Sequence, residues 1–372
     1  MIRSTLLLLT FISGFIASLD AAKLSLFIGT SGSNGDGIYH TFFHTELKKF
    51  TKPTRIAEIN SPNFLTLHPN LNCLYAVCRW DKTAGVIGYY ISDSQELTEF
   101  TRMECPDGMG CHLAVHPTGR FLLTAQYGAG SIALYPLDQS GNLKKPKIIK
   151  HNGGSKVFQN RQDRPHPHWS GFSPCGNYAL IPDLGLDQIV IYKLVPEEMK
   201  LIRHGIARSK AGSGPRHMRF SKDGKYIYLL NELDLTVTTF SWNPKSGVAN
   251  PISTIQALTE TQKENESFNS AAEILVHPSG PYVYSSNRGH DSVTVYAEKE
   301  AGMLEVIQVQ PIRGAFPRNI NLAPGGNWLF ACGQHSGTIG AHQINRNTGR
   351  LTYQKGATTR VPDPSCIVFS TR

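Results

Sequence analysis

Long apolar runs and CxxC pairs are scarce in this sequence, and both absences narrow the fold class. The one long apolar run in the 372 residues is 6–19, which is shorter than the roughly 20 residues of a membrane-spanning helix. We therefore expect no membrane partner. The seven cysteines have irregular spacings, which indicates neither a disulfide framework nor a zinc site. Cys105 and Cys111 flank a Gly-rich loop and are either free thiols or a pair that bridges in an oxidising compartment.

Dense blocks of Lys and Arg are also missing, although the chain is basic overall. The formal net charge is +9 and the pI is about 9.1, so the field of the protein attracts anions. The basic residues are scattered, and no nucleic-acid-binding signature is present. We expect a small phosphorylated or carboxylated molecule as the partner, and no nucleic acid.

The N-terminal residues have the pattern of an export signal. A short basic start precedes the apolar run, and the small residues Ala21 and Ala22 follow it. Residues 1–22 are predicted to be a signal peptide of a periplasmic or secreted protein, with a cytoplasmic protein as the alternative. Residues 23–372 are predicted to form one domain and a monomer.

Six similar segments, such as "RHMRFSKDGKYIYLL" and "CHLAVHPTGRFLLTA", recur along the chain. Their anchor residues are separated by 46 to 57 positions, the period of a propeller blade. The anchors are His68, His116, Ser173, Ser221, His277 and Ala323. A seventh half-segment ends at Ser370, and "KLSLFIGT" with "GIYHTFF" near the N-terminus would complete its blade. The pattern predicts an all-β, seven-bladed β-propeller with four-stranded antiparallel blades, closed by pairing of the terminal strands.

Polar residues gather at the strand ends of each repeat. Five repeats carry a proline six residues before the anchor, which marks the start of the first strand. The position after this proline, or its equivalent, holds Asn63, Cys111, His168, Arg216, Ala272, Arg318 and Ser365. The next position holds Phe64, His112, Trp169, His217, Glu273, Asn319 and Cys366. The end of the second strand holds Arg79, Tyr127, Leu184, Glu232, Arg288 and Gln334.

These strand ends are expected to meet at one rim of the ring, because the start of the first strand of an antiparallel hairpin lies beside the end of the second. A charged group at such a mouth costs desolvation unless it is paired or binds a ligand. We therefore interpret this rim as the functional face. The structural alternative is an Arg216–Glu232 ion pair and solvated strand ends. A metal site at His166 and His168, or at three histidines with His112 and His217, stays an alternative to our prediction of no metal and no cofactor.

Three segments carry a family resemblance. "PHPHWSGFSPCGNYALIPDLGLDQIVIY", "GSGPRHMRFSKDGKYIYLLNELDLTVTTF" and "SAAEILVHPSGPYVYSSNRGHDSVTVY" resemble the lactonase family of seven-bladed propellers, which includes a 6-phosphogluconolactonase and a carboxy-cis,cis-muconate lactonising enzyme. The resemblance implies a catalytic set made of His168, Arg216, Glu232 and Arg288. We also expect substrate contacts from His166, His217, Glu273, Asn287 and Arg318. This chain departs from the family pattern at Glu273 and Gln126, which bears on the substrate rather than the fold.

Lactone hydrolysis needs an activated water and a group that stabilises the oxyanion. We expect Glu232 or His168 to be the general base, Arg216 to stabilise the oxyanion, and Arg288 with Arg318 to hold the substrate's phosphate or carboxylate. The predicted function is a 6-phosphogluconolactonase-like hydrolase. A cycloisomerase of the muconate type and a non-enzymatic exported binding propeller are the alternatives.

Overall fold

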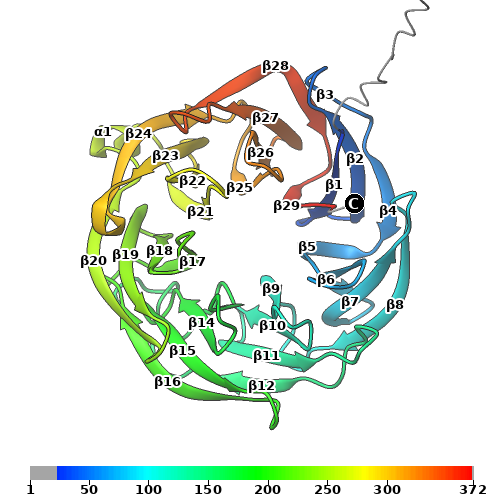
Figure 1. Cartoon of the computed structure of the whole chain (residues 1–372), viewed down its shortest axis with the longest axis vertical. Helices are drawn as coiled ribbons and strands as arrows, with labels where there is room; N and C mark the ends of the chain where they lie inside the picture. Colours follow the sequence, from blue (N-terminus) through cyan, green and yellow to red (C-terminus); the bar gives the residue numbers. More distant parts are fainter. Residues whose placement is uncertain (1–22, 371–372) are drawn as a thin grey trace, which may run out of the picture.

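The structure is a computed structural model that describes residues 23–370, which form a ring of seven β-sheets (Figure 1). The predicted export signal, residues 1–22, lies outside the described residues, so it stays a prediction. Among residues 23–370 the only helical segments are α1 (Glu260–Glu264) and the 3-10 turn η1 (Glu300–Gly302). No helix in this part of the chain has the length and apolar character needed to cross a membrane. The predicted all-β propeller is confirmed.

Each blade is an antiparallel sheet whose strands follow one another outward from the centre of the ring. The innermost strands are β5 (Asn60–Leu67), β9 (His112–Val115), β13 (Gly171–Phe172), β17 (Pro215–Phe220), β21 (Ser270–Val276), β25 (Pro317–Leu322) and β29 (Pro364–Phe369). The second strands are β6 (Cys73–Trp80), β10 (Phe121–Gln126), β14 (Tyr178–Asp183), β18 (Tyr226–Asn231), β22 (Tyr282–Arg288), β26 (Trp328–Gly333) and β1 (Lys23–Thr30). Every predicted anchor directly follows an innermost strand.

The outermost strand of each blade is more exposed than the third strand beside it. The third strands are β7 (Thr83–Ile91), β11 (Ser131–Pro136), β15 (Gln188–Val195), β19 (Thr236–Asn243), β23 (Ser292–Glu298), β27 (Thr338–Ile344) and β2 (Gly37–His44). The outermost strands are β8 (Leu97–Glu104), β12 (Lys147–Lys150), β16 (Lys200–Arg208), β20 (Val248–Gln256), β24 (Leu304–Pro311), β28 (Leu351–Arg360), and the pair β3 (Lys49–Phe50) and β4 (Thr54–Glu58).

The ring is closed by a sheet that contains both ends of the described chain. Strand β29 pairs antiparallel with β1, with Leu26 opposite Phe369. This pairing confirms the predicted closure, and it covers the inner edge of β1. The blade differs from the predicted four strands because β3 and β4 both pair with β2, which makes its sheet five-stranded.

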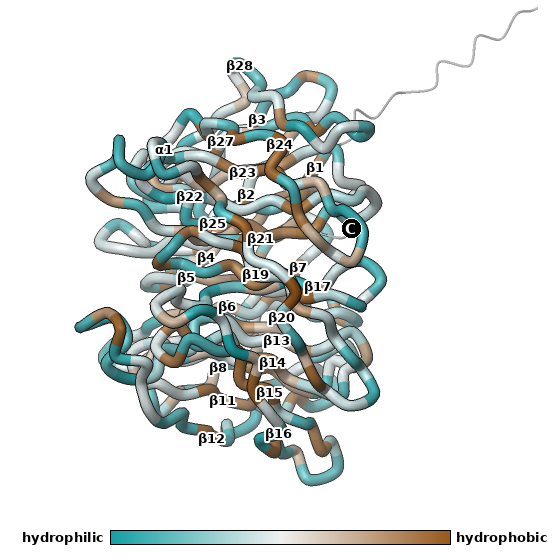
Figure 2. Tube along the Cα trace, turned by 90° about the vertical axis from the view of Figure 1, so that its left-hand side faces the viewer, coloured by the Kyte–Doolittle hydropathy of each residue, from teal (hydrophilic) through white to brown (hydrophobic). Residues whose placement is uncertain are grey.

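The hydrophobic core lies between neighbouring blades. One cluster packs Trp169 and Leu180 of one blade against Met218 and Phe240 of the next. Figure 2 shows the corresponding hydrophobic stretches along the strands and hydrophilic loops at the two faces of the ring. Burial of this apolar surface contributes about 25 cal/mol per Å². Each blade is therefore stabilised by its neighbours.

The anchor histidines join adjacent blades at the face opposite the polar strand starts. The Nε2 atom of His68 lies 3.1 Å from the carbonyl oxygen of Gly119 in the next blade. The same contact recurs between His116 and Gly176 at 2.9 Å. Gly119 has φ +73°, and a Cβ there would lie 2.5 Å from the His68 ring. These histidines are therefore structural, and the turn glycine is required beside them.

Candidate active site

A repeated break in strand register turns polar residues toward the centre of the ring. In β17, Pro215 pairs with Asn231 and His217 pairs with Leu230, so Arg216 is an extra residue. Arg318 is the extra residue in β25, between Pro317 and Asn319. A proline has no N–H to donate to the ladder, and a bulge re-aims the side chains beside it. The residue after the proline therefore points away from the regular ladder.

The strand starts of several blades converge on one small pocket, which we call the rim pocket. Its lining residues are Asn63, Phe64, Cys111, His168, Arg216, His217, Arg318 and Ser365. All except Phe64 and His217 occupy the position after the proline, and those two occupy the next position. Residues more than 300 positions apart in sequence thus share one pocket because the ring is closed by β29.

Glu232 is the centre of the charged contacts beside the rim pocket. Its Oε2 atom lies 2.7 Å from Nε of Arg216 and 3.2 Å from Nη2 of Arg288. Its Oε1 atom lies 2.5 Å from Nη2 of Arg161. Nε2 of His168 is 4.0 Å from Oε2. Three guanidinium groups and one imidazole therefore surround a single buried carboxylate.

These neighbours keep Glu232 ionised. Burial raises the pKa of a carboxyl group, but Arg288, Arg216, His168 and Arg161 together lower the pKa of Glu232 below its ordinary value. A carboxylate with a lowered pKa is a weak proton acceptor. Glu232 is therefore better suited to holding the arginines than to deprotonating water.

The arginines differ in how firmly they are held. Arg288 donates from Nη2 to the hydroxyl oxygen of Ser270 and, at 2.7 Å, to the carbonyl oxygen of Ala271. Burial lowers the pKa of Arg288 to about 9 and that of Arg318 to about 10. Among residues 23–370, Arg318 has no hydrogen bond or carboxylate partner. Arg318 is therefore the cation at this pocket that is left to bind an anion.

His168 is buried and uncharged near neutral pH. Burial, followed by the charge of Arg216, lowers the pKa of His168 well below its ordinary value. Its Nδ1 atom lies 3.9 Å from Sγ of Cys111. Burial raises the pKa of the Cys111 thiol to about 11, so this cysteine is protonated at neutral pH. The rim pocket thus offers a neutral imidazole beside a thiol.

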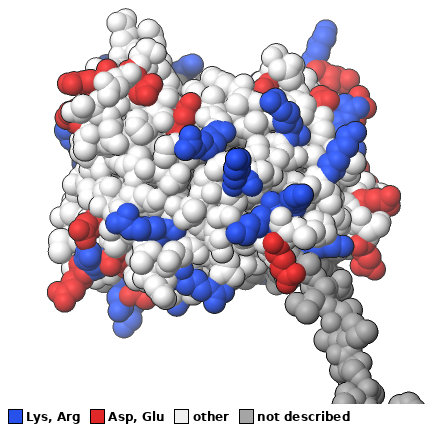
Figure 3. Space-filling model, turned by 90° about the horizontal axis from the view of Figure 1, so that it is seen from above, with Lys and Arg blue, Asp and Glu red and all other residues white. Residues whose placement is uncertain are grey.

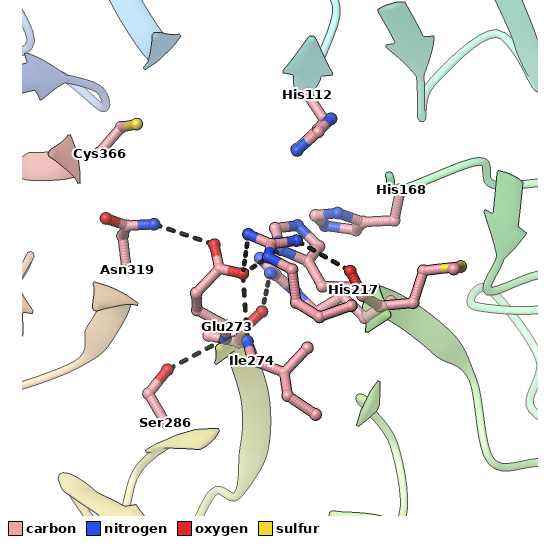
Figure 4. Close-up of polar contacts among 12 residues, drawn as sticks. His112, His168, His217, Glu273, Ile274, Ser286, Asn319 and Cys366 are labelled. Carbon is pink, nitrogen blue, oxygen red and sulfur yellow. Dashed lines mark hydrogen bonds and ion pairs between the residues drawn. The ribbon is translucent and has the colours of Figure 1, made fainter. Parts of the chain in front are cut away.

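A second buried carboxylate, Glu273, lies next to the rim pocket (Figure 4). Its Oε1 atom is 3.0 Å from Nδ1 of His217 and 3.0 Å from Nη2 of Arg219, and its Oε2 accepts from Asn319 at 2.9 Å. Glu273 lines a cavity of about 240 Å³ that shares Phe64 with the rim pocket. The two carboxylates, Glu232 and Glu273, therefore bracket the rim pocket.

Two of the predicted site residues are turned toward other parts of the blades. Nδ1 of His166 lies 2.8 Å from the carbonyl oxygen of Tyr127, and its ring stacks on that tyrosine at 4.3 Å. The amide of Asn287 donates to Ser292 and Thr294 on the adjacent strand β23. Neither residue is among those that line the rim pocket. Glu232, Arg288 and Glu273 do not line the pocket either.

The two histidines of the alternative metal site do not lie on a strand. His166 and His168 precede β13, which is only two residues long, and their rings have different polar partners. Among the described residues there is no cluster of three His, Cys, Asp or Glu side chains arranged to hold a metal ion. All seven cysteines lie in the described part of the chain and are free, including Cys105 and Cys111.

The repeat analysis missed two residues of the site. Arg161, which contacts Glu232, comes from the long connection between β12 and β13, outside the repeated pattern. Arg219 reaches Glu273 from a later position in β17. The length of the connection is the signal that sequence offers for Arg161, because long connections in compact domains are commonly functional.

Comparisons with known proteins identify the family of this chain. Residues 25–369 match the family described as lactonase, 7-bladed beta-propeller. The chain is 32% identical to 6-phosphogluconolactonase of Bacillus subtilis, over 92% of this chain and 97% of the other. Its fold is similar to a putative 6-phosphogluconolactonase from Bacteroides fragilis, with a TM-score of 0.85 and 28% identity over 95% and 99% of the two chains.

A periplasmic gluconolactonase from Pseudomonas aeruginosa is also similar, with a TM-score of 0.85 and 25% identity over 94% and 99% of the two chains. The molecule is thus a seven-bladed propeller with a polar site at one end of its central channel. The chain belongs to the lactonase family of seven-bladed β-propellers.

Proposed function

We propose that this protein is a carboxylic ester hydrolase that opens a sugar lactone at the rim pocket, with 6-phosphogluconolactonase-like activity. The observation that carries the proposal is the convergence of Arg216, Arg318 and a neutral histidine on one pocket. In the reaction, water adds to the lactone carbonyl and the ring C–O bond breaks. The ring oxygen takes a proton, and the product is a hydroxy acid.

The arginines supply the positive charge that this reaction needs. Arg216 is fixed by Glu232 and by its Nη1 hydrogen bond to the carbonyl oxygen of Ala272. A cation held in place in a dry site stabilises the developing oxyanion without reorganising. Arg318 anchors the phosphate or carboxylate of the substrate, and Arg288 adds charge while it supports Glu232.

The proton acceptor in this proposal is a neutral imidazole. Glu232 is unsuited because its two oxygens are already paired with Arg161, Arg216 and Arg288. His168 and His217 both line the rim pocket, and their ring centroids are 5.3 Å apart. Imidazole is the side chain most often used as a general base in enzymes.

The test is a turnover screen of the chain without residues 1–22. Five- and six-membered lactones, each with and without a phosphate group, are offered in the presence and absence of a chelator. We expect hydrolysis of at least one six-membered sugar lactone. Absence of turnover across the panel, together with a rise in melting temperature on adding a sugar acid, would indicate a binding propeller instead. Deuterium from solvent at carbon in the product would indicate a cycloisomerase.

The proposed partner is a small anionic lactone or a sugar acid. The protein is proposed to be a monomer. Figure 3 shows one side of the ring, on which Lys and Arg lie among uncharged and acidic residues instead of one continuous basic surface. That distribution supports a local anion site over a polyanion-binding surface.

We also propose that the protein is exported. The pattern of residues 1–22 and the similarity to a periplasmic gluconolactonase support this proposal. An exported enzyme would meet unphosphorylated aldonolactones more often than phosphorylated ones. Cell fractionation and N-terminal sequencing of the mature chain test it, and an intact Met1 in the cytoplasmic fraction would contradict it.

A further inference from the structure

His217 and Glu273 form a carboxylate–imidazole pair on adjacent inner strands (Figure 4). Nδ1 of His217 lies 3.0 Å from Oε1 of Glu273, and both residues are buried. The carboxylate is held from other directions as well, by Asn319, Arg219 and the backbone N–H of Ile274. With its carboxylate fixed in this way, Glu273 favours the His217 tautomer that carries its proton on Nδ1.

The other ring nitrogen of His217, Nε2, is available to accept a proton. Nε2 is buried, and it has no hydrogen-bond partner within the described chain. His217 lines the rim pocket beside Arg216, His168 and Arg318. The rim pocket has a volume of about 10 Å³, which is room for about one water molecule. In the proposed reaction the pocket therefore holds the attacking water, and the larger lactone ring lies at its mouth. A buried nitrogen without a partner is costly unless it serves a ligand or a reaction.

We propose that His217 is the general base of the lactonase reaction and that Glu273 is its positioning residue. The inference rests on the proposed function and names the proton acceptor in it. Nε2 takes a proton from water while the water oxygen bonds to the lactone carbonyl carbon. When the ring C–O bond breaks, the same proton passes from Nε2 to the ring oxygen. This transfer returns the imidazole to its neutral form. The product acid then releases its own proton to solvent.

His168, the other histidine in the pocket, is less well placed for this role. Its Nε2 is 4.0 Å from Glu232, whose oxygens already accept from arginines. Glu232 is too far from His168 for a hydrogen bond that would fix its tautomer, and its charge offsets only part of the lowering of the His168 pKa. The pair formed by His217 and Glu273 has the arrangement of a base and its orienting carboxylate.

The charges around His217 favour its neutral form before reaction. Burial lowers the pKa of His217 well below its ordinary value, and the nearby arginines lower it further. The charged and titratable groups that face it are Arg216, Arg219, Arg318, Arg288, Glu273, His112 and His168. Glu273 offsets part of the cost when the ring becomes protonated during the reaction.

The experiment compares the pH dependence of kcat in the wild type and in His217→Gln. We expect a level wild-type profile between pH 6.5 and 8.5, because the base is already neutral there. In His217→Gln we expect kcat to be ~10²-fold lower at pH 7, with KM within about twofold. Hydroxide would then replace the missing base, so the residual enzymatic rate should rise ~10-fold per pH unit.

A matched control exists in the chain. His151 also forms a buried pair with a carboxylate, 2.6 Å from Asp183, and its Nε2 also has no partner within residues 23–370. This pair is not among the residues lining the rim pocket. His151→Gln should lower the melting temperature but leave the level pH profile of kcat unchanged. The comparison separates loss of a buried imidazole from loss of a base.

Glu273→Gln is the second variant, needed if His217→Gln fails to fold. It should lower kcat ~10-fold or more at unchanged KM, and Glu273→Asp should restore part of that loss. Wild-type turnover together with a level profile and near-normal kcat in His217→Gln, or unchanged kcat in Glu273→Gln, would overturn the assignment. Absence of turnover in the wild type itself would overturn the proposed function instead.

Discussion

Arg216 and Arg318 border one pocket, but only Arg216 has a carboxylate partner in the described part of the chain. The charge of Arg216 is one cause of the lowered pKa of Arg318, after burial. Two neighbouring guanidinium groups with one shared counter-charge leave an excess of positive charge. An anionic group of the substrate is the natural complement to Arg318.

Arg318→Gln should weaken binding of anionic lactones. Hydrogen bonds to charged groups contribute about 1.5–3 kcal/mol, so KM for a phosphorylated lactone should rise ~10- to 100-fold, with kcat little changed. KM for an unphosphorylated lactone should change much less. Steady-state kinetics on the two substrates measure the difference. Arg208→Gln, on the exposed outer strand β16, is the control, and equal effects on both substrates would argue against the anchoring role.

Arg216→Ala should remove the stabilisation of the oxyanion. We expect turnover to fall ~10²-fold or more, by comparison with the loss of an oxyanion-hole donor. Arg216→Lys should restore little, because an ammonium group cannot reproduce the contacts of Nε with Glu232 and of Nη1 with Ala272. Kinetics on the folded fraction, checked by circular dichroism, give the answer. Unchanged turnover in folded Arg216→Ala would refute the role.

Glu232→Gln should change how stability depends on pH. The pKa of Glu232 in the folded chain lies below its ordinary value of about 4.3. Its ionised form therefore stabilises the fold above that value, and the contribution is lost as pH falls through the folded pKa. The melting temperature of Glu232→Gln should be lower than that of the wild type at pH 7, and the gap should narrow from pH 5 to pH 3. A gap that stays constant with pH would contradict this.

Deletion of residues 364–372 should abolish closure of the ring. Without β29 the β1 edge is exposed, and the inner strand of that blade is missing. We expect loss of cooperative thermal unfolding and association through the open edge, measured by circular dichroism and gel filtration. Deletion of residues 371–372 alone is the control. A truncated chain that stays monomeric with a normal melting temperature would show that the closure is dispensable.

The repeat in the sequence was sufficient to predict the fold, because a blade has local signals. The turns after four anchors contain a glycine with positive φ, namely Gly119, Gly176, Gly224 and Gly326. The proline before Arg216 marks a strand start, and the alternating apolar residues mark the buried faces. Each signal recurs in several blades, so an error in one repeat is corrected by the others.

The site could be predicted only in part from the sequence, because its contacts do not follow the repeat. The position of Arg318 in the repeat predicts that it lies at the rim, but the absence of a carboxylate partner depends on the whole ring. Arg161 comes from a connection with no counterpart in other blades. Asn287 lies next to Arg288 in sequence, yet neighbouring strand residues face opposite sides, and its amide binds β23.

The pairing of β29 with β1 also determines when the enzyme can become active. Ser365 in the rim pocket and Cys366 in the adjoining cavity belong to the final strand. Synthesis runs from the N-terminus, so β29 is made after the strands of the other six blades. A polypeptide that stops before β29 would lack part of the pocket wall. Lactone opening would therefore begin only after β29 has been made and has paired with β1.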